Sequence, residues 1–81
     1  MLALKIEPGI ITSRTIEING ELAYTIVLTA RRYRRSAFKI SVTALTLLGA
    51  TTIRREHFTD LTSAREAFQA TVTDLQHLQT R

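Results

Sequence analysis

Residues 22–48, LAYTIVLTARRYRRSAFKISVTALTLL, decide the fold of this chain. Two stretches in this segment alternate apolar and polar residues with a period of two, which is typical of β-strands with one covered face. The covered face is predicted to consist of Leu22, Tyr24, Ile26, Leu28 and Ala30 in the first stretch and of Phe38, Ile40, Val42 and Ala44 in the second. The two faces match when Leu28 lies opposite Ile40 and Ala30 lies opposite Phe38, because a slip of one residue would reverse every side chain. The segment therefore predicts an antiparallel hairpin.

The flanking sequence extends this hairpin into a sheet. Between residues 10 and 58 threonine, isoleucine and valine dominate, and these residues favour strands. Residues 1–9 form either a short additional strand or an extended arm. The sequence thus predicts an antiparallel meander of four strands, with residues 1–9 as a candidate fifth.

Two turn signals set the expected registers of the outer strands. Around Asn19-Gly20, a three-residue loop of residues 18–20 would place Ile16 opposite Leu22, whereas a two-residue type I′ turn would place Ile16 opposite Ala23. The three-residue loop keeps the apolar faces together and is preferred. In LLGATT, residues 47–52, we expect a two-residue turn with Gly49 first, which places Thr46 opposite Ile53.

The last segment, FTDLTSAREAFQATVTDLQHLQ, predicts a helix over residues 60–80. Apolar residues recur at spacings of three and four, at Leu61, Ala64, Phe68, Val72 (or Thr71), Leu75 and Leu78. Asp60 is the expected N-cap, and Ser63 with Glu66 forms a competing capping box. The predicted fold class is α+β: one domain of 81 residues, in which the C-terminal helix packs on one face of the sheet.

One helix covers one face, so the other face is expected to stay open. The expected open face carries Ser13, Thr15, Glu17, Thr25, Val27, Thr29, Arg31, Lys39, Ser41, Thr43, Leu45, Thr52, Arg54 and Glu56. Val27, Leu45 and Leu47 could form an apolar patch on it, and such patches commonly mark an interface. We therefore expect a homodimer interface that includes these three residues.

The basic residues are concentrated at one place in the sequence. Eleven Lys and Arg residues and seven Asp and Glu residues give a net charge of +4, and the cluster Arg31, Arg32, Arg34 and Arg35 accounts for this excess. Arginine donates two parallel hydrogen bonds to phosphate, and Tyr33 could stack on a base. We expect this cluster to bind nucleic acid, with Lys39 and Arg54 in support. The alternative is a solvated hairpin loop, and the residues do not distinguish DNA from RNA or single from double strands.

The sequence contains no catalytic or cofactor motif. It has no cysteine, and His57 and His77 lack the spacing of a metal pair. Strand alternation places Glu56 and His57 on opposite faces, which makes them poor partners for acid–base catalysis. We expect no enzyme activity, no cofactor, no metal and no small-molecule substrate. The N-terminus lacks a signal-peptide pattern, and no apolar run is long enough for a membrane span, so a soluble cytoplasmic protein is expected.

The order of four strands and one helix resembles the topology of Whirly-type single-strand binders and of the arm-binding domains of phage integrases. The resemblance is one of topology alone, so no residue role is carried over from it; it implies nucleic-acid binding by fold analogy. The competing hypothesis is a protein-interaction or assembly module, such as an accessory protein of a phage or mobile element. Such a module would use the open face or a strand edge.

Overall fold

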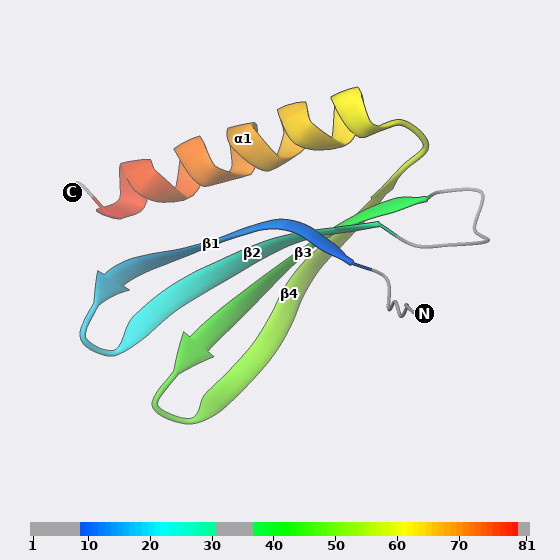
Figure 1. Cartoon of the computed structure of the whole chain (residues 1–81). Helices are drawn as coiled ribbons and strands as arrows, with labels where there is room; N and C mark the ends of the chain where they lie inside the picture. The colour runs from blue at the N-terminus through cyan, green and yellow to red at the C-terminus, as the bar shows by residue number, and fades with distance from the viewer. Residues whose placement is uncertain (1–8, 31–36, 80–81) are drawn as a thin grey trace.

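The computed structural model describes residues 9–30 and 37–79. They form β1 (Ile10–Asn19), β2 (Leu22–Ala30), β3 (Phe38–Thr46), β4 (Gly49–Phe58) and α1 (Leu61–Gln79). The four strands form one antiparallel sheet in the order β1-β2-β3-β4, and α1 packs on one of its faces (Figure 1). The predicted meander followed by one helix is confirmed. The expected strand or arm at the N-terminus falls on residues 1–9, of which 1–8 lie outside the described residues.

The central hairpin has the predicted register. Leu28 lies opposite Ile40, and Ala30 lies opposite Phe38. This pairing brings the apolar residues of β2 and β3 onto the face under α1, where they form the core. The buried apolar residues are Ile16, Ile26, Leu28, Ile40, Val42, Ala64, Phe68 and Val72.

The β1–β2 turn differs from both predicted loops. Gly20 and Glu21 form the turn, Asn19 lies opposite Leu22, and Ile16 lies opposite Tyr24. The side-chain Oδ1 of Asn19 accepts a hydrogen bond from the backbone amide of Glu21 at 2.7 Å, which closes the turn one residue later than expected. A bulge between Glu17 and Asn19 absorbs the extra residue. Ile16 still faces the core, as predicted, because the register moves by two residues.

The β3–β4 turn also differs from the prediction. Leu47 and Leu48 form the turn, and Gly49 begins β4 opposite Thr46. The Thr46 hydroxyl accepts a hydrogen bond from the Leu48 amide at 3.1 Å and donates one to the Gly49 carbonyl at 3.3 Å. Gly49 has a φ of 132°, which side-chain-bearing residues rarely adopt. Glycine is therefore needed just after the turn and not inside it.

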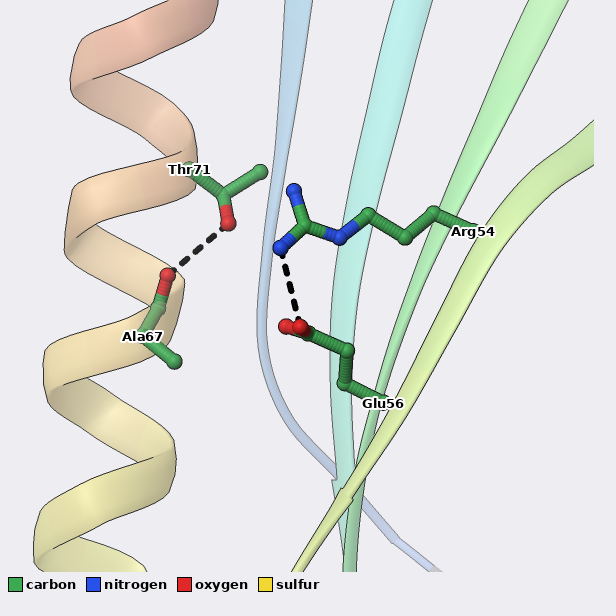
Figure 2. Close-up of polar contacts among 4 residues, drawn as sticks. All are labelled: Arg54, Glu56, Ala67 and Thr71. Atoms are coloured by element: carbon green, nitrogen blue, oxygen red, sulfur yellow. Dashed lines mark hydrogen bonds and ion pairs between the residues drawn. The ribbon is translucent and has the colours of Figure 1, made fainter.

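The helix begins after Asp60, as predicted. The Ser63 backbone amide donates to the Asp60 carboxylate at 3.0 Å, so Asp60 is the N-cap, and the competing cap at Ser63 falls inside the helix. Both candidates for the fourth apolar position, Thr71 and Val72, are buried. Figure 2 shows how Thr71 is accommodated: its hydroxyl donates to the Ala67 carbonyl at 2.9 Å. Leu78 was expected in the core but is 48% exposed, because it lies at the last turn of the helix.

Candidate nucleic-acid interface

The face of the sheet opposite α1 is open within the described part of the chain. Strand pairing places four rows of side chains across it, each row with one residue from each strand. In order from the β1–β2 turn, the rows are Glu17, Ala23, Leu45 and Ala50; Thr15, Thr25, Thr43 and Thr52; Ser13, Val27, Ser41 and Arg55; and Ile10, Thr29, Lys39 and His57. The prediction of a hydroxyl-rich open face is confirmed.

A row of threonines crosses all four strands. Thr15 and Thr25 share a hydroxyl hydrogen bond of 3.2 Å, and Thr43 and Thr52 share one of 3.4 Å. Hydroxyl pairs of this kind stabilise neighbouring strands. The threonine row therefore has a structural role of its own and separates the two ends of the open face.

Basic side chains gather at the end of the open face that lies farthest from the β1–β2 turn. Lys39 on β3 lies opposite His57 on β4, and Arg55 lies one row nearer the centre, opposite Ser41. The acidic residue on the described part of this face is Glu17, at the other end. The open face thus has a basic end, which we define as Lys39, Arg55 and His57.

Arg54 was expected on the open face with Lys39, but it lies on the opposite face. A register shift at Ile53 places Arg54 opposite Val42, on the face that α1 covers. Glu56 was also expected on the open face, but it lies opposite Ile40 on the helix side. Arg54 and Glu56 form an ion pair with an N–O distance of 2.9 Å there (Figure 2). The shift brings Arg55 to the open face in place of Arg54.

Sequence reasoning missed Arg55 because a bulge leaves no mark on the alternation of TTIRREH, residues 51–57. The turn provides the indirect signal. A turn at Leu47 and Leu48 pairs Thr43 with Thr52. Phe58, the last residue of β4, must still pack against the core under the helix. Phe58 can face the core opposite Phe38 only if one residue of β4 is added between Thr52 and Phe58.

The remaining predicted nucleic-acid-binding residues, Arg31, Arg32, Tyr33, Arg34 and Arg35, lie outside the described residues. The structure does place the strand ends that flank this cluster. Ala30 lies opposite Phe38, and Lys39 is the next residue of β3. The cluster is therefore joined in sequence to the strand ends beside the basic end.

The three predicted interface residues do not form one continuous patch. Leu45 is 37% exposed on the open face, and Leu47 is 78% exposed in the turn. Both line a shallow groove of 280 Å³ together with Leu22, Glu17 and Glu21, among others. Val27 lies two rows away from Leu45, because the threonine row comes between them. Leu45 and Leu47 thus lie at the turn end, whereas Ile10, which is 65% exposed, lies in the same row as Lys39 at the basic end.

Within residues 9–30 and 37–79, no group of three His, Asp or Glu side chains is placed to hold a metal ion. No helix in this part of the chain is long and apolar enough to cross a membrane. When the chain is compared with protein-family models, curated proteins and solved structures, nothing matches.

Proposed function

We propose that this protein is a small, non-enzymatic nucleic-acid-binding protein that contacts the phosphate backbone through Arg31, Arg32, Arg34 and Arg35. One observation carries the proposal. In the sequence this cluster lies between Ala30 and Phe38, which pair with each other at the basic end of the open face. Lys39 adds a cation beside the cluster. Localised positive charge of this kind attracts polyanions and favours their rapid association.

The distribution of charge supports a specific contact over general attraction to anions. Outside the arginine cluster, basic and acidic residues are equal in number. The excess of positive charge thus comes from one short stretch of the sequence. Arginine also suits phosphate better than lysine does, because its planar guanidinium donates two parallel hydrogen bonds.

Replacing Arg31, Arg32, Arg34 and Arg35 together by alanine tests the proposal. We expect the wild type to bind labelled DNA or RNA with an affinity that falls as salt rises, because binding releases counterions from the phosphates. The variant should lose this binding and keep the circular dichroism spectrum of the wild type. Failure of the wild type to bind any form of DNA or RNA at low salt would reject the function.

The alternative function, a protein-interaction or assembly module, is favoured by one observation. Leu45, Leu47 and Leu48 are exposed together around the β3–β4 turn, and Leu48 is 99% exposed. An exposed apolar group of this kind is a common feature of interfaces. The basic end would then serve solubility or an acidic protein partner.

A variant with Leu45 and Leu47 replaced by serine separates the two functions. If the turn end mediates self-association, sedimentation will show a dimer for the wild type and a monomer for the variant. Nucleic-acid binding by the basic end should survive in the variant, because the threonine row lies between the two surfaces. Equal sedimentation of the two proteins as monomers would remove the support for assembly through this surface.

A further inference from the structure

We infer that Arg55, with Lys39, forms a phosphate-binding strip on the open face, which extends the proposed nucleic-acid site onto the sheet. This inference depends on the proposed function and specifies more of its site. The occupant is the sugar–phosphate backbone of a nucleic-acid strand, held through its phosphates and not through its bases.

The strip is built by the pairing of β3 and β4. Lys39 and His57 are direct cross-strand partners, and Arg55 is two residues from His57 on the same strand and the same face. Opposing side chains on adjacent strands have Cβ atoms about 5 Å apart, and residues two apart on a strand are separated by about 7 Å. Lys39 and Arg55 are therefore close enough to contact one continuous stretch of backbone.

The charges of this strip are not neutralised within the described part of the chain. Neither Lys39 nor Arg55 has a side-chain hydrogen bond or ion pair with another described residue. Glu17, the acidic residue of this face, lies on β1 beyond the threonine row. Arg54, by contrast, is paired with Glu56 on the helix side. Two adjacent arginines in the sequence thus differ in both face and electrostatic environment.

The chemistry of the surrounding side chains fits phosphate better than bases. Ser41 and Ser13 share a row with Arg55, and Thr29 shares a row with Lys39. Hydroxyl groups donate hydrogen bonds to phosphate oxygens and position a backbone without reading sequence. No aromatic ring of the Phe or Tyr type lies on the described open face, because Tyr24, Phe38 and Phe58 pack against the core on the other side. The strip therefore lacks the stacking platform that single-strand binders use for bases.

The test compares Arg55→Ala with Arg54→Ala as a matched control. Both variants remove one arginine from neighbouring positions of β4, but only Arg55 lies on the open face. We expect R55A to weaken binding of a labelled oligonucleotide about tenfold, the loss expected for one charge-assisted hydrogen bond. R55A should also lower the slope of log affinity against log salt by about 0.7 for a single strand or about 0.9 for a duplex. R54A should bind like the wild type, and K39A should behave like R55A.

Two further measurements make the outcome decisive. Thermal unfolding checks that R55A and R54A are folded. R55A should weaken the affinity for a normal oligonucleotide and for its abasic counterpart by the same factor. If R55A weakens the affinity only for the normal oligonucleotide, contact with the backbone is overturned. The phosphate-binding strip is rejected if R55A and R54A bind the oligonucleotide with equal affinity. The proposed function still stands in that case, provided that the wild type binds and the four-arginine variant does not. If the wild type binds nothing, the proposed function itself fails.

Discussion

Asp60 stabilises the first turn of α1 as an ionised carboxylate. Hydrogen bonds from the backbone and side chain of Ser63 lower the pKa of the Asp60 carboxyl below its ordinary value of 3.8. A carboxyl group whose pKa is lower in the folded state stabilises the fold above its ordinary pKa. That contribution is lost as the pH falls below 3.8 and through the lowered value. The cap should therefore depend on pH in the acidic range only.

We predict that Asp60→Ala lowers the thermal unfolding midpoint by several degrees at pH 7 and by much less near pH 2. The loss of the cap leaves amides of the first turn without their acceptor, which destabilises the helix. Asp60→Asn is the matched control, because asparagine also caps but carries no titrating group. Melting curves followed by circular dichroism give the measurement. A difference between wild type and D60A that is equally large at both pH values would contradict a role for the ionised carboxylate.

Ile53 decides which arginine of β4 reaches the open face. Alternation in the sequence correctly assigned the faces of Lys39, Thr43 and Leu45, because no irregularity occurs in β3 itself where it pairs with β2. It failed for Arg54, since the extra residue at Ile53 reverses the faces of all later positions of β4. A sequence pattern with period two records which residues alternate, but it does not record where a single residue is added.

Among the elements, the central hairpin was predictable to the residue and the outer hairpins were not. In β2 and β3 both strands carry long apolar faces, and only one register buries them together. The outer turns are closed by side chains, Asn19 in one and Thr46 in the other. These local hydrogen bonds compete with the turn types that glycine suggests, and they moved each turn away from its expected position. The helix was predictable because its cap and its apolar spacing agree.

For the whole molecule, a single apolar layer between the sheet and α1 supplies the core. Ile26 is fully buried in this layer, whereas its neighbour Val27 lies half-buried on the open face. α1 covers β4 least, and most residues of β4 are exposed. A domain of this size has a thin margin of stability, about 4–12 kcal/mol by the usual amount per residue. A change in the single layer should therefore cost much of that margin, and a change on the open face should cost little.

We predict that Ile26→Ala lowers the free energy of unfolding by about 2–5 kcal/mol, because it leaves a cavity at the centre of the layer. Val27→Ala is the matched control: it is the next residue of the same strand, and we expect it to cost less than about 1 kcal/mol, because Val27 is only half-buried. Urea denaturation of both variants at two protein concentrations gives the measurement. A cost for V27A that equals that of I26A, with midpoints that rise with protein concentration, would mean that a second copy covers the open face. The basic end of that face would then be closed to a nucleic-acid backbone, and binding would have to rely on the arginine cluster between β2 and β3.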